Sequence, residues 1–330
     1  MTRAVLMIPG RGSYTERQLG SLRADDKRVQ RAESLRARYG LEPLLSLDGA
    51  ERFSPALHLR PANVSPLIWL ISVMDAEAAM EQHNVVAIGG NSMGWYTALT
   101  VAGALSFDDG FRLVQEMALE QETGNPGGQI IYPLVNEHWR RQEVQEQAVE
   151  SALAKQPGQV FASIHLGGYA VLAGSTQGVS ELLRALPPVT IGKTRYPFKL
   201  VQHGPYHTPL ASDVAERARV RLQDLNFRSP RVPMIDGRGI QTSPWSVDLE
   251  ALRGYTLGAQ VDEPYDFTSS VRVALREFAP DRVVLPGPGN TLGGVIGQIL
   301  VQERWRGITD KAGFEALQAS DNPIVESMRR

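Results

Sequence analysis

The chain has 330 residues, of which 42% are apolar and 21% are charged, and this predicts a packed globule of two domains or of one domain with an insertion. Its 34 Lys and Arg residues nearly balance its 36 Asp and Glu residues, for a net charge of −2, so we expect no nucleic-acid partner. Cysteine is absent, which excludes disulfides, thiolate metal sites and a cysteine nucleophile. The longest strongly apolar stretch, residues 66–74, is too short to span a bilayer, and the N-terminus lacks the pattern of a signal peptide, so we expect a cytoplasmic protein.

Most of the chain alternates short apolar strands with helices, a pattern that indicates a mainly parallel sheet. The strands expected in this α/β body are residues 4–8, 85–88 and 282–285. The expected helices are residues 15–39, 66–82 with Pro66 in the first turn, 95–105, a helix capped by Ser106, 210–225, 271–278 and 293–302.

Residues 126–201 have a different pattern, in which strands and helices follow the order β-α-β-β-α-β. This order is typical of a ferredoxin-like unit. Its expected strands are residues 129–135, 160–165, 169–173 and 194–201, and its expected helices are residues 137–155 and 175–186. We therefore predict a catalytic body made of residues 1–125 and 202–330, interrupted by a small α+β subdomain at residues 126–201.

Residues 90–94, Gly-Asn-Ser-Met-Gly, fit the pattern G-x-S-x-G between an expected strand and an expected helix. This is the setting of a nucleophile elbow, in which the two glycines leave room for a sharp turn with a strained serine at its apex. Ser92 would then lie at a helix N-terminus, where free N–H groups stabilise a developing oxyanion. The alternative is a tight turn in which the serine hydroxyl only caps the helix.

A serine nucleophile needs a base, and histidine is the usual one. Of the six histidines, His83 precedes a strand and His138 lies on a polar helix, so both are expected at the surface. His203 and His207 flank Gly-Pro-Tyr on a loop that returns to the body, and either could be the base or a structural histidine. Spacing alone does not decide between them and assigns no acidic partner.

Five segments together resemble the malonyl-CoA:acyl-carrier-protein transacylases and the acyltransferase domains of polyketide synthases. The matching segments, which extend over nearly the whole chain, are residues 8–14 (IPGRGSY), 90–99 (GNSMGWYTAL), 102–109 (AGALSFDD), 204–208 (GPYHT) and 286–292 (PGPGNTL). The resemblance implies an α/β-hydrolase-like body with a ferredoxin-like insert. It also implies fatty-acid or polyketide biosynthesis, acyl carrier protein and acyl-CoA as partners, and no permanently bound cofactor beyond the acyl-CoA or phosphopantetheine thioester substrate.

The resemblance further implies a Ser–His dyad and a ping-pong reaction. Ser92 would attack an acyl thioester, and His207, which matches the motif histidine, would take the serine proton and return it to the leaving thiol. The backbone carbonyl of Gln260 would orient His207. The backbone N–H groups of Met93 and Arg11 would form the oxyanion hole.

Departures from the family pattern concern the expected acyl site. Met117 stands where malonyl-specific members have an arginine that pairs with the substrate carboxylate, which favours a non-carboxylated acyl group. The alternative is that Met117 is core packing and that Arg11 binds the carboxylate. Asn91, Trp95 and Ser65 also depart from the pattern; Trp95 would line the acyl pocket or pack between helices.

Four functions follow from these residues. The first is acyl transfer to the thiol of a carrier protein through an acyl-Ser92 intermediate. The second is hydrolysis of acyl thioesters by the same dyad, which would differ only in the group that resolves the acyl-enzyme. The third is malonyl transfer with a relocated carboxylate site. The fourth is a non-catalytic interaction module, against which the joint presence of Ser92, His207 and Gln260 argues.

Overall fold

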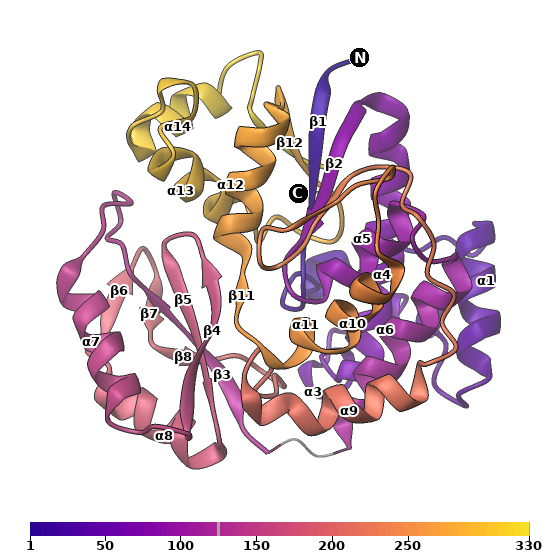
Figure 1. Cartoon of the computed structure of the whole chain (residues 1–330), viewed down its shortest axis with the longest axis horizontal. Helices are drawn as coiled ribbons and strands as arrows, with labels where there is room; N and C mark the ends of the chain where they lie inside the picture. Colours follow the sequence, from indigo (N-terminus) through magenta and orange to yellow (C-terminus); the bar gives the residue numbers. More distant parts are fainter. Residues whose placement is uncertain (124–125, 330) are drawn as a thin grey trace.

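The computed structural model describes residues 1–123 and 126–329 and is built around a six-stranded sheet (Figure 1). The strand order is β10-β9-β2-β1-β12-β13, and every neighbouring pair is parallel except β9 and β10. The strands are β1 (Arg3–Ile8), β2 (Asn84–Gly90), β9 (Met234–Ile235), β10 (Gln241–Thr242), β12 (Arg282–Leu285) and β13 (Val325–Ser327). The predicted mainly parallel sheet is confirmed.

The central strand β1 contributes side chains to two separate cores. Residues 4–8 are fully buried, and alternate residues point to opposite faces of the sheet. Ala4, Leu6 and Ile8 pack against one set of helices, and Val5 and Met7 against another. A continuous apolar run, rather than an alternating one, is therefore what this strand requires.

Helices cover both faces of this sheet. The core on the first face includes residues of α1 (Lys27–Ala37), α2 (Leu44–Asp48), α4 (Pro61–Gln82), α5 (Gly94–Val101), α6 (Phe107–Glu122), α9 (Ser212–Arg221) and α10 (Leu249–Leu257). The second face carries α12 (Phe267–Phe278), α13 (Gly293–Gln302) and α14 (Lys311–Gln318). The short helices α3 (Pro55–His58) and α11 (Ala259–Asp262) lie in connections.

The predicted helix at residues 15–39 is wrong in its first half. Residues 16–18 form only a short 3-10 turn, and α1 begins at Lys27 because the Asp26 carboxylate accepts from the Arg28 N–H as an N-cap. Other helices also differ at their ends: α5 ends at Val101, α9 spans only Ser212–Arg221, and α12 begins at Phe267.

Helix α4 begins at Pro61, so Pro66 lies inside it and not in its first turn. A proline cannot donate to the carbonyl four residues earlier, which here is that of Ala62. That carbonyl instead accepts from Arg36 Nη1 at 2.8 Å and from Gln115 Nε2 at 3.2 Å. These long-range hydrogen bonds satisfy the acceptor that Pro66 leaves free, and the helix continues.

A second sheet has the order β11-β4-β5-β3-β8. Its strands are β3 (Gly128–Pro133), β4 (Val160–Leu166), β5 (Tyr169–Gly174), β8 (Phe198–Lys199) and β11 (Tyr265–Asp266). Helices α7 (Glu143–Ala154) and α8 (Thr176–Ala185, capped by Ser175) pack against it around a third core. The antiparallel order β4-β5-β3-β8 is that of the ferredoxin-like unit, as predicted.

The insert differs from its prediction in two elements. Helix α7 begins at Glu143, and the preceding residues form a turn closed by a bridge between Val135 and Arg141. The last strand is split at Pro197, which has no N–H for a ladder, into β8 and β7 (Thr194–Tyr196); β7 pairs with β6 (Val189–Ile191).

The predicted boundary before residue 126 adjoins residues 124 and 125, which lie outside the described residues. The division into body and subdomain remains a prediction. Strand β11 belongs to the predicted body but pairs with β4, so the second sheet includes residues from both parts. Among the described residues, no helix, α4 included, is long and apolar enough to cross a membrane.

The carboxyl ends of β1 and β2 point toward the second sheet (Figure 1). In open α/β sheets this edge holds the ligand where neighbouring strands connect in different directions. Strand β1 lies between β2 and β12, so the loops after all three strands meet at this edge.

In the turn after β2, position 94 has no room for a side chain larger than that of glycine. A Cβ there would lie 2.3 Å from the Ile8 carbonyl oxygen, so Gly94→Ala must separate α5 from β1. We expect Gly94→Ala to lower the free energy of unfolding by about 1–3 kcal/mol, the usual cost of overpacking. Urea unfolding measures this change.

Gly254→Ala is the matched control, because a Cβ at this exposed helical position meets no other atom within 4 Å. It should keep or slightly raise stability. Equal urea midpoints for the two variants would contradict the close approach.

Candidate active site

Ser92 stands at the apex of the turn between β2 and α5, in the strained conformation expected of an elbow. Its φ is 53°, in the left-handed region that residues other than glycine seldom adopt. The turn closes tightly, because a Cβ on Gly90 would lie 2.4 Å from the Gly94 carbonyl carbon. The chain therefore presents the Ser92 side chain at the carboxyl edge of the sheet, as the motif predicts.

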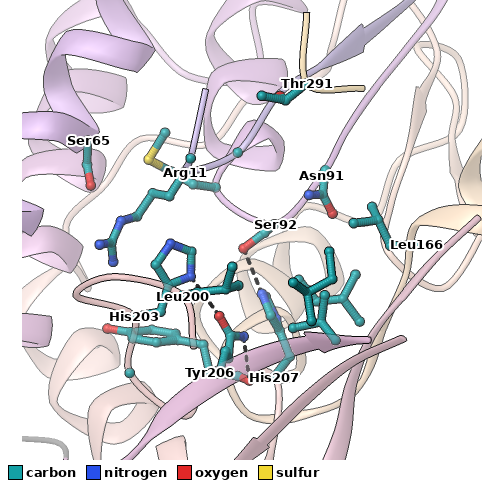
Figure 2. Close-up of a pocket in the computed structure, with 18 of the residues that line it drawn as sticks. Arg11, Ser65, Asn91, Ser92, Leu166, Leu200, His203, Tyr206, His207 and Thr291 are labelled. Carbon is teal, nitrogen blue, oxygen red and sulfur yellow. Dashed lines mark hydrogen bonds between the residues drawn. The ribbon is translucent and has the colours of Figure 1, made fainter. Parts of the chain in front are cut away.

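His207 approaches Ser92 from the loop that follows the second sheet. Its Nε2 lies 2.7 Å from Ser92 Oγ (Figure 2). Its Nδ1 lies 2.8 Å from the Gln260 carbonyl oxygen. Because a carbonyl can only accept, Nδ1 carries the proton and Nε2 is free to accept from the serine hydroxyl. The His207 N–H also donates to the Val261 carbonyl at 2.7 Å, which holds the loop against α11.

The Gln260 side chain holds the elbow from the other side. Its Nε2 donates to the Ser92 carbonyl at 3.1 Å, and its Oε1 accepts from the Tyr96 hydroxyl at 2.6 Å. One residue thus contacts both the serine turn and the imidazole.

Burial sets the protonation state of His207. Removal from water penalises the imidazolium and lowers the pKa of His207 to about 4, although the hydrogen bond to Gln260 opposes the shift. The imidazole is therefore neutral at neutral pH, in the form that accepts a proton.

The loop after β1 lies directly against the elbow. A Cβ on Gly10 would be 2.6 Å from the Asn91 carbonyl oxygen and 3.4 Å from Ser92 Cβ. The next residue, Arg11, is therefore close to the serine, and Met93 follows the serine at the start of α5. Neither of these two amides donates to a backbone or side-chain acceptor in the described part of the chain, so both are available to an oxyanion.

A cavity of about 430 Å³ opens at Ser92 between the two sheets. Ser65, Asn91 and Met117, all predicted from sequence, line it together with Arg11, Met93, His207 and Gln260. Much of its wall is apolar and comes from α6, α13, the second sheet and the residues next to them, namely Val114, Met117, Ala118, Ile131, Ile164, Leu166, Val171, Leu200, Leu292 and Val295.

The prediction that Trp95 binds substrate is wrong. Its indole is fully buried, donates from Nε1 to Thr256 Oγ1 at 3.1 Å and packs edge-on against Tyr255. Trp95 thus packs α5 against α10. Successive helical residues point in different directions, so the next residue, Tyr96, lines the cavity in its place.

The prediction of a surface position for His83 is also wrong. It ends α4, is 8% exposed and lies 3.5 Å from Glu326 of β13. His138 is exposed, as predicted.

His203 lines the cavity but does not contact Ser92. Its Nδ1 lies 2.8 Å from Gln129 Oε1, a partner on β3 that sequence reasoning missed (Figure 2). Tyr206 was missed as well, although it lies inside the motif that carries His207. Nearly every residue of β3 is buried, so the sequence pattern gave no sign that the Gln129 side chain faces the cavity.

The Arg11 side chain extends into the same cavity. Its Nη1 donates to Gln121 Oε1 and its Nη2 to the Gln202 carbonyl. Burial lowers the pKa of Arg11 to about 10, so the guanidinium remains charged at neutral pH.

Within residues 1–123 and 126–329, no group of three or more His, Cys, Asp or Glu side chains could hold a metal ion.

The buried imidazole predicts an unusually low acid limit for acylation of Ser92. A free histidine titrates near 6.5, whereas His207 titrates at about 4. We expect kcat/KM for acylation to stay nearly constant as the pH falls and to drop with a midpoint near about 4. Rapid-quench acylation with acetyl-CoA across this range measures it.

Far-UV circular dichroism is the necessary control for this profile. Because the folded pKa lies below the unfolded one, the folded state also loses stability as the pH falls from about 6.5 to about 4. A midpoint near 6.5 in a folded sample would contradict the lowered pKa of His207.

Comparisons with known proteins agree with this geometry. No family model matches the chain. The malonyl CoA-acyl carrier protein transacylase of Haemophilus influenzae is 24% identical over 96% of this chain and 99% of its own length. The protein of the same name from Escherichia coli K12 is 26% identical over 91% of this chain and 94% of its own.

A solved structure of a type II polyketide acyl-carrier protein in complex with its malonyl-transacylase has the same fold. The TM-score is 0.74 at 18% identity, over 100% of this chain and 96% of that one. The resemblance predicted from the motifs is therefore confirmed, and almost the whole chain is similar to the malonyl CoA-acyl carrier protein transacylases.

Proposed function

We propose that the chain is a cytoplasmic acyltransferase that moves an acyl group from acyl-CoA or an acyl carrier protein to the phosphopantetheine thiol of a carrier protein. The observation that carries the proposal is the linked set of Ser92 Oγ, His207 Nε2 and the Gln260 carbonyl at the mouth of an apolar cavity. The names of the relatives, and the carrier protein bound to one of them, support the same reaction.

In the first half-reaction, Ser92 Oγ attacks the thioester carbonyl while its proton moves to His207 Nε2. The N–H groups of Met93 and Arg11 bind the oxyanion. The C–S bond then breaks, the leaving thiolate takes the proton from Nε2, and an ester remains on Ser92. The carrier-protein thiol reverses these steps in the second half-reaction.

The Gln260 carbonyl supports this cycle without changing protonation. It accepts a hydrogen bond from the Nδ1–H of His207 throughout, so only Nε2 is available to exchange a proton with serine or thiol. A carbonyl stabilises an imidazolium less than a carboxylate does. The hydrolysis alternative uses the same atoms with water in place of the thiol. An acyl-enzyme that persists in buffer without thiol would exclude it, and rapid loss of the acyl group in buffer would support it.

We further propose that the acyl group is not carboxylated. Met117 is 5% exposed and forms part of the cavity wall on α6, together with Val114 and Ala118. None of these three side chains can pair with a carboxylate, so a carboxylate placed against this part of the wall would be unpaired, which is strongly unfavourable. A thioether contacts an apolar chain well.

The dyad predicts distinct losses for three variants. Ser92→Ala should abolish the acyl-enzyme that intact mass spectrometry detects. His207→Ala should slow acylation by roughly 10²–10⁴-fold, the usual contribution of general-base assistance. His203→Ala should slow it less, because His203 bonds to Gln129 and not to Ser92. Equal losses for the two histidines, or an adduct on another residue, would contradict this assignment.

Met117 predicts which acyl group is preferred. A charge-assisted hydrogen bond contributes about 1.5–3 kcal/mol, so its absence should cost malonyl roughly tenfold to a hundredfold in kcat/KM. We expect acetyl- and butyryl-CoA to exceed malonyl-CoA on the unmodified protein, and Met117→Arg to shift the ratio toward malonyl.

Met117→Leu is the matched control for this shift, because it keeps an apolar side chain of similar size. It should retain the original order of substrates. If malonyl-CoA is preferred by the unmodified protein, Met117 is not the determinant.

A further inference from the structure

Three polar atoms at the cavity take no part in the Ser92–His207 dyad. They are Arg11 Nε, the Tyr206 hydroxyl oxygen and His203 Nε2. Arg11 Nε and the Tyr206 hydroxyl are both buried, and neither has a hydrogen-bond partner in the described part of the chain. Both residues line the cavity, as does His203. In Figure 2 the guanidinium, the phenol and the imidazole of these residues lie on one side of Ser92. Buried donors without a partner are rare and costly, which indicates that a bound group accepts hydrogen bonds from them.

Neighbouring residues fix the unused donor of Arg11. Gln121 Oε1 and the Gln202 carbonyl hold the two terminal nitrogens, and Gln121 Nε2 also donates to that carbonyl at 2.8 Å. The guanidinium therefore cannot rotate to satisfy Nε by itself. Gln121 lies one helical turn after Met117 on α6, so this group is on the side of the cavity that the proposed function assigns to the acyl chain.

A chain of hydrogen bonds makes His203 an acceptor. Gln129 Nε2 faces the Ser163 hydroxyl at 2.8 Å and the Tyr206 carbonyl at 3.4 Å, which directs Gln129 Oε1 toward His203. Nδ1 of His203 must then carry the proton, and Nε2 has a lone pair. Burial is the largest cause that holds the pKa of His203 well below its usual value, and the positive charge of Arg11 is the second largest. The imidazole is therefore neutral at neutral pH, and Nε2 keeps its lone pair.

This arrangement presents two donors and one acceptor. A carboxylate can accept from Arg11 and Tyr206, but it meets the lone pair of His203. An unsubstituted alkyl chain leaves all three atoms without partners. A hydroxyl has two lone pairs, so it can accept from both Arg11 and Tyr206 and donate its own proton in a hydrogen bond to His203 Nε2. Resting on the proposed acyltransferase function, we propose that the acyl subsite selects an acyl chain that carries a hydroxyl group, bound among Arg11, Tyr206 and His203.

Matched pairs of acyl-CoAs test this selection on the full chain. Glycolyl-CoA is compared with acetyl-CoA, and 3-hydroxybutyryl- and 4-hydroxybutyryl-CoA with butyryl-CoA, by kcat/KM for acylation of Ser92. At least one hydroxylated member should exceed its partner by roughly tenfold or more, because a site built around hydrogen bonds rejects the analogue that lacks the hydroxyl. The member with the largest ratio also gives the position of the hydroxyl along the chain.

Three variants locate the preference. Tyr206→Phe removes one hydroxyl, His203→Phe removes the acceptor, and Arg11→Met removes the charged donor while it keeps the backbone N–H. Each should move the hydroxyl-to-alkyl ratio toward one. His138→Ala, on the exposed histidine, is the control and should keep the original ratio.

The outcomes separate this inference from the proposal beneath it. Ratios near one in every pair, with Ser92 acylated, overturn the inference and leave the acyltransferase proposal intact. Faster acylation by malonyl-CoA than by every hydroxylated member also overturns it and makes the cluster a carboxylate site. If no acyl-CoA modifies Ser92, both proposals fail.

Discussion

The geometry of the site depends on the hydrogen bonds of one glutamine. Gln260 accepts from His207 through its backbone carbonyl and contacts the Ser92 carbonyl and the Tyr96 hydroxyl through its side chain. The serine turn, the returning loop and α11 come from distant parts of the sequence, and this residue sets their relative positions. Because the orienting group is a neutral carbonyl, the buried site needs no carboxylate, whose desolvation would be expensive.

The elements that sequence predicted best are those with a local physical cause. Strand β12 and helix α13 have the predicted bounds, because a short apolar run and the surrounding Pro and Gly residues define their ends. The start of α4 could not be predicted, since the carbonyl that Pro66 leaves free finds its partners on two other helices. The strands β9, β10 and β11 have two residues each and are too short to show periodicity.

The same distinction applies to the site. The elbow at Ser92 follows from glycine spacing between a strand and a helix, and it was found without any relative. Spacing left His203 and His207 open, the resemblance favoured His207, and the 2.7 Å contact with Ser92 agrees with that choice. The prediction for Trp95 was wrong because sequence did not show which face of α5 points to the cavity. A shift of one residue along the helix changes whether a side chain faces the cavity or α10. Gln129 became visible only once β3 was placed against the returning loop.

Hydrogen bonds hold two glutamines of α6 in place, and this affects how the wall of the cavity can change during evolution. Gln115 is bound to Arg36 and to the Ala62 carbonyl, and Gln121 is bound to Arg11 and to the Gln202 carbonyl. The turn that bears Met117 lies between them, so its backbone position is set by residues other than Met117. A codon change at 117 can alter the volume or charge of the wall without moving the helix. Related proteins could therefore differ in the acyl group they prefer through one substitution at position 117, while the fold and the Ser–His dyad stay the same.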